Sequence, residues 1–395
     1  MAMTPSTRLP VTVVSGFLGA GKTTLLRHLL LESGQRLAVV VNEFGDVGID
    51  GDLIASCGFC PEEERDARLV ELTNGCLCCT VQDDFLPTME RLLERSDQLD
   101  GIVVETSGLA LPAPLVAAFG WPAIRTRLRV QAVVTVVDGE ALAAGHVVGD
   151  PEAVEAQRRA DPSLDHISAL EELFADQLQA ADLVLVSRAD LLSADALLRV
   201  TGRLSEEVRA GTGVLPMARG RIDPALVLDA PDRSVSQGGD TPGSRGPSPD
   251  DHDHGPMQGS TDPGRGDGPV HHGKDDVHDH DHDHDHDHDH DHRHAQIASL
   301  VLRRDGHWEK PAIEAWLSQL LREQPVLRLK GRLVQAGRSM PLQIQAVGPR
   351  LECWYEKATG DPATPPGLEL VLLAPASQES TLRQSLTGLP SPGPG

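Results

Sequence analysis

Long apolar runs are missing from this sequence, and their absence is the first constraint on its function. No stretch of about 18 consecutive apolar residues occurs, so the sequence predicts no membrane-spanning helix and no membrane partner. A strand is expected within ten residues of Met1, which leaves no room for a signal peptide. We therefore expect a soluble, cytoplasmic protein.

Basic and aromatic residues are scarce as well. The 35 Lys and Arg residues are outnumbered by 59 Asp and Glu residues, which gives a formal net charge of −24, and much of the acid lies in one tract. An acidic chain repels phosphate backbones, so nucleic acid is not an expected partner. Aromatic residues make up 3% of the chain, which fits an α/β core rich in Ala, Leu and Val.

Cysteine is too rare for a disulfide scaffold. The chain of 395 residues has six cysteines, and three of them lie within residues 76–79. Such crowding indicates metal or thiol chemistry in a reducing compartment.

Short apolar strands alternate with helical stretches in the first half of the chain. Strands are expected at 9–15, 37–41, 102–105, 130–137 and 183–186, and a helix at 22–31. This alternation predicts a doubly wound, mostly parallel α/β sheet over residues 1–228.

The composition then changes twice. Residues 229–294 are rich in Asp, His, Pro, Gly and Ser, which predicts a disordered linker. Strand and helix patterns resume over 295–376 and predict a small α+β domain, with strands at 297–302, 326–333, 341–347 and 350–354 and a helix at 310–321. Residues 377–395 are expected to be a disordered tail.

Residues 16–23 fit the phosphate-loop pattern Gly-x-x-x-x-Gly-Lys-Thr, between a predicted strand and a predicted helix. The N–H groups of such a loop bind nucleotide phosphates together with the positive end of the helix. Lys22 is expected to bind the β and γ phosphates, and Thr23 to bind Mg²⁺. The other expected contacts are Gly16, Gly19, Ala20, Gly21 and Thr24. The alternative is a glycine-rich turn with a surface lysine.

The strand that ends at Glu105 is followed by Thr-Ser-Gly. Glu105 is expected to hold the water shell of Mg²⁺, and the N–H of Gly108 to sense the γ-phosphate. Lys22, Thr23 and Glu105 are thus the candidate catalytic residues.

The segment Ser187-Arg-Ala-Asp190 follows a later strand, where guanine-binding proteins usually carry Asn-Lys-x-Asp. Asp190 can accept hydrogen bonds from guanine N1 and N2, and the aliphatic stem of Arg188 can lie on the base. Ser187 cannot replace the Asn amide. GTP is preferred over ATP as the nucleotide.

Cys76, Cys78 and Cys79 form a Cys-x-Cys-Cys element in a predicted loop. Three thiolates favour Zn²⁺, Co²⁺ or Cu⁺ over Mg²⁺, and they leave one tetrahedral position for an exchangeable ligand. The alternatives are a redox pair or buried cysteines. Glu43 is a further candidate ligand, or equally a surface acid in a switch loop.

Two other features suggest metal binding less specifically. Cys57 and Cys60 are spaced like half of a zinc ribbon, and no second Cys-x-x-Cys completes it. Thirteen of the 17 histidines lie between His252 and His294, mostly in strict alternation with Asp. Such a tract offers many weak metal sites. A low-complexity spacer or a tag are the alternatives.

Together these motifs resemble the CobW family of P-loop metallochaperone GTPases. The resemblance covers the phosphate loop and segments 42–51, 71–85, 105–114, Asp138 and 182–191, and it extends to segments 326–331 and 345–350. Segments 41–52, 80–85 and 105–112 look closest to the family member that acts in cobalamin biosynthesis.

The resemblance implies GTP hydrolysis, metal binding at the three cysteines, and delivery of Co²⁺ to the cobaltochelatase of aerobic cobalamin synthesis. The alternatives are a zinc chaperone that transfers Zn²⁺ to client metalloproteins, and a metal-binding scaffold that needs no nucleotide. Thiolate sites bind Zn²⁺ more tightly than Co²⁺, so the choice of cobalt rests on the resemblance alone.

Overall fold

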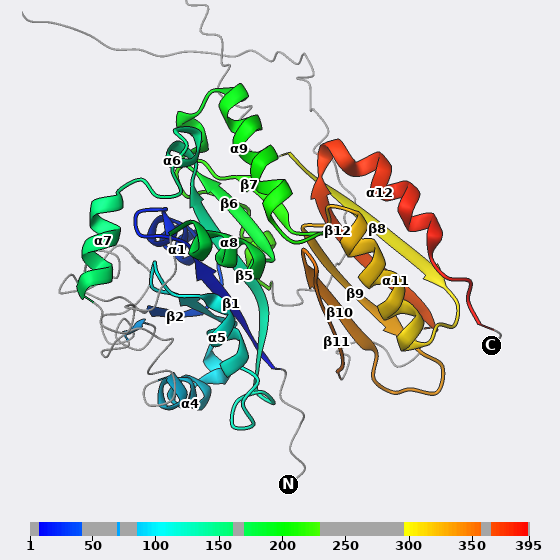
Figure 1. Cartoon of the computed structure of the whole chain (residues 1–395). Coiled ribbons are helices and arrows are strands. Elements are labelled where there is room, and N and C mark those ends of the chain that lie inside the picture. The colour runs from blue at the N-terminus through cyan, green and yellow to red at the C-terminus, as the bar shows by residue number, and fades with distance from the viewer. Residues whose placement is uncertain are drawn as a thin grey trace, which may run out of the picture. The chain divides into compact units, whose positions relative to one another are not determined.

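Two β-sheets organise the part of the chain that the computed structural model describes (Figure 1). The first sheet has seven strands and the second has five. The described residues are 8–41, 69–71, 85–160, 170–229, 296–356 and 365–393. Glu43, the Cys-x-Cys-Cys element, Cys57, Cys60 and the histidine tract lie outside these residues.

The first sheet is parallel throughout, in the order β3-β2-β4-β1-β5-β6-β7. Its central strand, β1, is buried at every position, because helices cover both faces of the sheet. The predicted doubly wound sheet is therefore confirmed. The strands are β1 (Leu9–Ser15), β2 (Leu37–Val41), β3 (Leu69–Glu71), β4 (Gly101–Glu105), β5 (Leu128–Asp138), β6 (Leu183–Ser187) and β7 (Gly213–Pro216).

Alternate strand residues enter different cores on the two faces of this sheet. On one face Val14 packs with leucines of α1 (Lys22–Glu32) and with α10 (Pro224–Val227). On the other face Val13 packs with α4 (Leu86–Glu94) and α5 (Pro112–Ala118). This second face continues over α6 (Gly139–Ala143), α7 (Pro151–Ala160), α8 (Leu170–Ala180) and α9 (Ala194–Glu207). None of the helices in the described residues is long and apolar enough to cross a bilayer.

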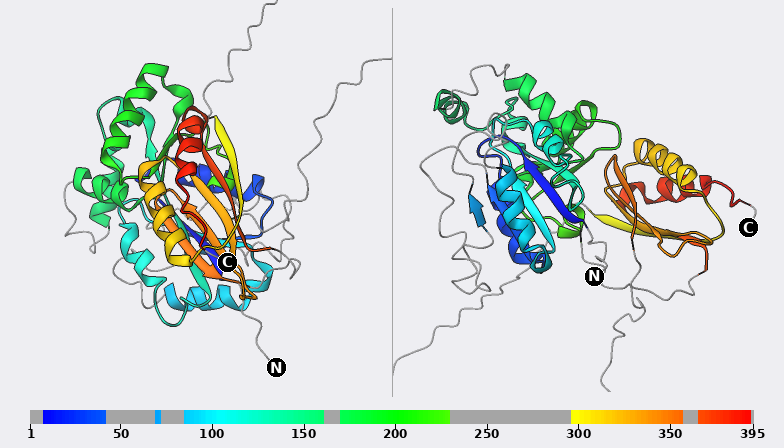
Figure 2. Two further views of the ribbon diagram at one scale, coloured as in Figure 1. Left: turned by 90° about the vertical axis from the view of Figure 1, so that its right-hand side faces the viewer. Right: turned by 90° about the horizontal axis from the view of Figure 1, so that it is seen from below.

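The second sheet is antiparallel, and its helices lie on one side of it (Figure 2). Burial alternates along β12, whose Leu370 and Leu372 pack against Ile313 and Leu317 of α11. A period of two is what a sheet with one covered face requires. The elements are β8 (Ile297–Asp305), α11 (Lys310–Glu323), β9 (Arg328–Val334), β10 (Leu342–Val347), β11 (Arg350–Tyr355), β12 (Gly367–Pro375) and α12 (Glu379–Ser385).

The expected tail at 377–395 is wrong over its first part. Helix α12 lies within it, and Leu382 and Leu386 are buried in the core of the second sheet. The two leucines are four residues apart and therefore share one helix face. The Ser, Pro and Gly residues that follow dominate the composition and concealed this short amphipathic pattern. Asp229, which was assigned to the linker, is likewise ordered.

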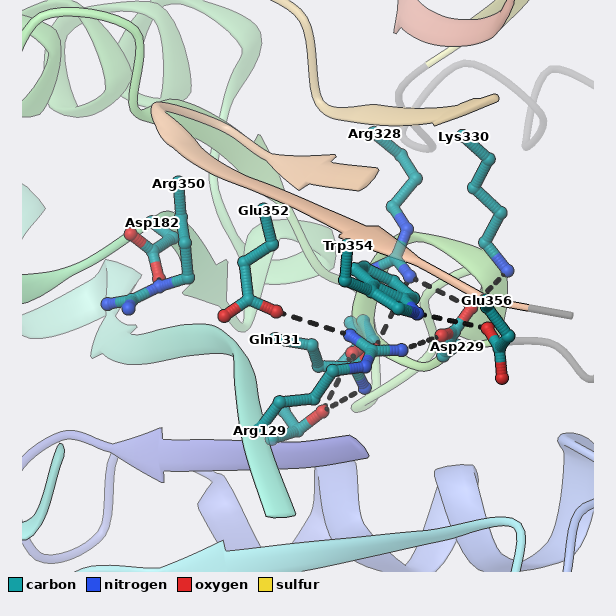
Figure 3. A network of polar contacts seen from close by, with 12 residues as sticks. Arg129, Gln131, Asp182, Asp229, Arg328, Lys330, Arg350, Glu352, Trp354 and Glu356 are labelled. Carbon is teal, nitrogen blue, oxygen red and sulfur yellow. Dashed lines mark hydrogen bonds and ion pairs between the residues drawn. The ribbon is translucent and has the colours of Figure 1, made fainter. Parts of the chain in front are cut away.

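The two sheets meet in a polar network around Asp229 (Figure 3). The carboxylate of Asp229 pairs with Arg129 of β5 and with Arg328 and Lys330 of β9. Arg129 also lies 3.6 Å from Glu352 of β11. Burial alone would raise the pKa of Asp229, but Lys330, Arg328 and Arg129 outweigh it and lower this pKa to about 2.

Candidate nucleotide-binding site

The loop between β1 and α1 has a backbone that only glycine adopts easily. Gly16, Gly19 and Gly21 have φ angles of 133°, 75° and 101°. A Cβ atom on Gly16 would lie 2.1 Å from the carbonyl oxygen of Val136, so the loop can pass this close to β5 only with glycine there. Helix α1 then begins at Lys22 with no acidic residue in its first turn. Its N-terminus therefore keeps the positive potential that attracts phosphate.

Lys22, the first residue of α1, faces Glu105, the last residue of β4. Strands β1 and β4 pair with Val14 opposite Glu105, which puts the end of β4 beside the phosphate loop. The Nζ atom of Lys22 lies 3.7 Å from Oε1 of Glu105 and donates to the carbonyl oxygen of Phe17 at 3.2 Å. Both side chains are buried. The lysine is thus held inside the site before any phosphate arrives.

One cavity of about 450 Å³ brings the predicted motifs together. The ends of β1, β4 and β6 lie on one edge of the parallel sheet, where ligands of such sheets bind. Residues of the phosphate loop, Glu105 and the segment after β6 all contribute to the lining. The predicted residues in the lining are Gly19, Gly21, Lys22, Thr23, Thr24, Glu105, Ser187, Arg188 and Asp190.

Other predicted residues lie elsewhere. Gly16 and Ala20 are in the loop but do not line this cavity, and neither does Gly108. A Cβ atom on Gly108 would lie 2.6 Å from the backbone nitrogen of Leu18, so glycine lets the turn after β4 pack against the phosphate loop. The described residues contain no group of three or more His, Cys, Asp or Glu that could hold a metal ion. The three cysteines and Glu43 are outside those residues.

The segment after β6 contacts a loop that the sequence analysis did not identify. The backbone N–H of Arg219 donates to Oδ1 of Asp190 at 3.3 Å, and Nε of Arg219 lies 3.5 Å from Oδ2. Met217, Arg219 and Gly220 also line the cavity. The short apolar run Val214-Leu215 could have indicated a further strand. Because parallel strands end at the same edge of the sheet, the residues after it would then be expected near the cavity.

Two arginines of this site have a strained backbone. In the described part of the chain, Arg188 and Arg219 are the non-glycine residues with positive φ, at 54° and 52°. Each such residue costs on the order of 1 kcal/mol or more, and the surrounding structure must hold it in place. Both line the nucleotide cavity, where strain of this kind is commonly concentrated.

Three buried hydroxyl groups at this edge fit a site that receives a polar ligand. The hydroxyls of Ser15, Thr106 and Ser187 have no hydrogen-bond partner among the described residues. These residues end β1, follow β4 and end β6, respectively. A buried hydroxyl without a partner is costly, and a bound nucleotide with its ion and water would supply partners.

Comparison with known proteins agrees with this geometry. Residues 10–216 match the family model described as CobW/HypB/UreG, nucleotide-binding domain, and residues 297–389 match the Cobalamin synthesis protein cobW C-terminal domain. The Zinc chaperone CobW of a Sinorhizobium species is 38% identical over 386 residues, which cover 97% of this chain and 97% of that protein.

Two further comparisons cover different shares of the chain. The Zinc chaperone CobW of Pseudomonas aeruginosa is 54% identical over 223 residues, which are 56% of this chain and 60% of that protein. The solved structure of the Zn(II)-bound YjiA GTPase from E. coli is 22% identical, covers 98% of this chain and all of that one, and has a TM-score of 0.37.

Proposed function

Since this chain belongs to the CobW/HypB/UreG family and is a GTPase metallochaperone, we propose that it delivers Zn²⁺ from its Cys-x-Cys-Cys element to a client metalloprotein. The names of the relatives support zinc as the cargo. The proposed ligands are Cys76, Cys78 and Cys79, because three thiolates suit Zn²⁺ and leave one position open for transfer.

The strand register is the observation that carries this proposal. Val41, the last residue of β2, lies opposite both Glu71 at the end of β3 and Glu105 at the end of β4. In the sequence, the segment with Glu43 follows β2, and the segment with Cys76 follows β3. Cys76 follows Glu71 by only five residues, a reach of at most about 17 Å. The chain that leads to the metal element therefore leaves the same edge of the sheet as Glu105, two strands away from it.

This arrangement supports coupling between nucleotide and cargo. Thr23 and Glu105 offer hard oxygen atoms in one cavity, which suits Mg²⁺ together with a triphosphate. The triphosphate and its Mg²⁺ would order the segments that leave β2 and β3, and hydrolysis would release them. Zinc would therefore bind tightly in the GTP state and transfer to the client after hydrolysis.

A second candidate cargo is Co²⁺ for the cobaltochelatase of cobalamin synthesis. The description of the family model that matches residues 297–389 favours this alternative. Affinity alone does not distinguish the two metals, because thiolate sites bind Zn²⁺ more tightly than Co²⁺ in any case. The cargo is the metal whose binding changes with the nucleotide.

The test is a titration of each metal into a variant that lacks residues 250–294, so that the histidines do not mask the site. Zn²⁺ affinity is expected to be roughly 5- to 150-fold higher with Mg²⁺ and a non-hydrolysable GTP analogue than with GDP. The variant with Cys→Ser changes at positions 76, 78 and 79 should lose this difference. A larger nucleotide effect for Co²⁺ than for Zn²⁺ would favour cobalt as the cargo. If neither metal bound with a different affinity in the two nucleotide states, the proposed coupling would be refuted.

A further inference from the structure

Asp138 and Arg188 form an ion pair beside the phosphate loop. Strands β5 and β6 pair in parallel with Asp138 opposite Ser187, so the two chains leave the sheet side by side. A Cβ atom on Gly139 would lie 2.5 Å from the carbonyl oxygen of Ser187. Glycine at this position therefore lets the two strand ends approach, and Arg188 follows within reach of Asp138.

The carboxylate of Asp138 is fixed by both of its oxygen atoms. Oδ1 accepts hydrogen bonds from the backbone N–H groups of Glu140 at 3.0 Å and Ala141 at 3.2 Å, which caps α6. Oδ2 pairs with Nη1 of Arg188. A Cβ atom on Gly149 would lie 2.7 Å from Oδ2, so the chain passes directly over this oxygen. The side chain is only 5% exposed, and the anion therefore has one fixed position.

The guanidinium of Arg188 is held at two points. Nη1 donates to Asp138, and Nη2 donates to the carbonyl oxygen of Gly19 in the phosphate loop at 3.2 Å. The Arg188 side chain is 42% exposed, so without these contacts it would sample several rotamers in solvent. A planar guanidinium directs two separate donors, which a single ammonium group does not do. The contacts thus fix the aliphatic stem along the cavity wall.

We propose that Asp138 is a positioning residue for guanine recognition, which it supports by holding Arg188 against the phosphate loop. The stem of Arg188 then forms a flat wall for the base, while Asp190 accepts its N1 and N2 hydrogens. The proposal rests on guanine nucleotide binding in this cavity. The hydrogen bond from Arg188 to Gly19 ties this segment to the phosphate loop without an Asn amide at position 187.

Asp138→Asn separates this role from the helix cap. The Asn side-chain oxygen can still accept from Glu140 and Ala141, whereas its NH₂ group would face the Nη1 donor of Arg188. We expect the Kd for GDP to rise about 10-fold, as for the loss of one charge-assisted hydrogen bond. The Kd for inorganic triphosphate, which has no base, should change less than about two-fold, and the thermal unfolding midpoint should stay near the wild-type value.

Two further variants test the route through Arg188. Arg188→Met keeps an unbranched stem without the guanidinium, and the double variant with Asp138→Asn should bind GDP no more weakly than Arg188→Met alone. Glu140→Gln is the matched control, because Glu140 is also near Arg188, at 3.8 Å, but is 47% exposed. It should leave GDP binding unchanged.

Equal weakening of GDP and triphosphate by Asp138→Asn would overturn the proposal, since Asp138 would then support the phosphate loop only. Additive losses in the double variant would also overturn it, because Asp138 would then act independently of Arg188. Failure of the underlying site has a different signature: the wild-type chain would show no preference for GDP over ADP.

Discussion

Nζ of Lys22 lies 3.7 Å from Oε1 of Glu105, and both side chains are buried where the phosphates of a nucleotide are expected. The pair gives Lys22 a structural role in addition to the phosphate binding that the motif predicts. The carboxylate stabilises the buried ammonium group before nucleotide arrives, and the ammonium group stabilises the carboxylate in the same way. Removal of either partner takes this ion pair away from a buried charge.

Lys22→Ala is therefore expected to have two separate effects. GTP hydrolysis should fall at least about 100-fold, because the cation that neutralises the phosphates is lost. The free energy of unfolding of the nucleotide-free protein should fall by on the order of 3 kcal/mol, because buried Glu105 loses its ion pair with Lys22. Phosphate release and chemical denaturation measure the two effects.

The double variant Lys22→Ala with Glu105→Gln distinguishes them. A neutral amide at position 105 has no buried charge to compensate, so stability should largely return while hydrolysis stays lost. If the double variant were less stable than Lys22→Ala, the buried pair would not be the cause of the destabilisation. Hydrolysis at the wild-type rate in either variant would contradict the assignment of the phosphate loop.

Asp190→Asn should exchange the preferred base. The carboxylate of Asp190 is proposed to accept from guanine N1 and N2, whereas xanthine carries a carbonyl group at C2 that an Asn amide can bind as a donor. We expect the Kd for GTP to rise about 100-fold and binding of xanthosine triphosphate to appear. The Asn oxygen can still accept from the N–H of Arg219, which limits structural damage.

Competition binding with the four common nucleotides and xanthosine triphosphate measures this exchange. Asp195→Asn is a suitable control, because Asp195 is an exposed residue in the first turn of α9 and does not line the cavity. An unchanged preference for GTP in Asp190→Asn would show that another group recognises the base.

The parts of the site that sequence reasoning found are those with local signals. The phosphate loop has fixed glycine spacing, and Glu105 follows a continuous apolar strand, so both were found without a structure. Arg219 belongs to the same edge of the sheet but carries no local pattern of its own, and Asp138 was noted only as part of the family resemblance, without a role. Their proximity to Arg188 and Asp190 depends on which strands are neighbours, and the sequence alone does not fix that order.

The same distinction applies to the elements of the fold. Strand β12 alternates between buried and partly exposed residues, yet it was not predicted as a strand. Strand β7 is four residues long and half-buried at alternate positions, which is too short for a periodic pattern. The α+β class predicted for residues 295–376 was correct although β12 was missed, because four other strands and one helix were enough to indicate the class.

The histidine tract is expected to increase metal capacity without affecting hydrolysis. Deletion of residues 250–294 should leave the rate of GTP hydrolysis within about two-fold, and it should lower the number of weakly bound Zn²⁺ ions, since imidazole is a general ligand for divalent transition metals. Equilibrium dialysis with Zn²⁺ and a phosphate-release assay measure both. A variant with each His of the tract replaced by Asn keeps the length, and it should match the deletion in metal capacity.

Asp229 makes the contact between the two sheets dependent on pH. Its pKa is about 2 in the folded protein and 3.8 in an unperturbed chain, so the unfolded state binds more protons between these values. Stability from this group is therefore complete above about pH 5 and is lost as pH falls from about 4 to about 2. The shift corresponds to roughly 2 kcal/mol.

Asp229→Asn should remove this contribution and leave Arg129 and Arg328, which are 4% and 2% exposed, without their shared anion. At pH 7 the free energy of unfolding should fall by on the order of 3 kcal/mol. As pH is lowered from 5 to 3, the wild-type and variant curves from urea denaturation should converge, because the wild-type carboxylate becomes protonated in the unfolded chain. Glu369→Gln is the control: it removes two ion pairs from the second sheet, with Arg303 and Arg332, which are 65% and 45% exposed, and should change stability by less than about 1 kcal/mol. Parallel curves for Asp229→Asn and the wild type across this pH range would mean that the three cations do not hold the pKa of Asp229 low.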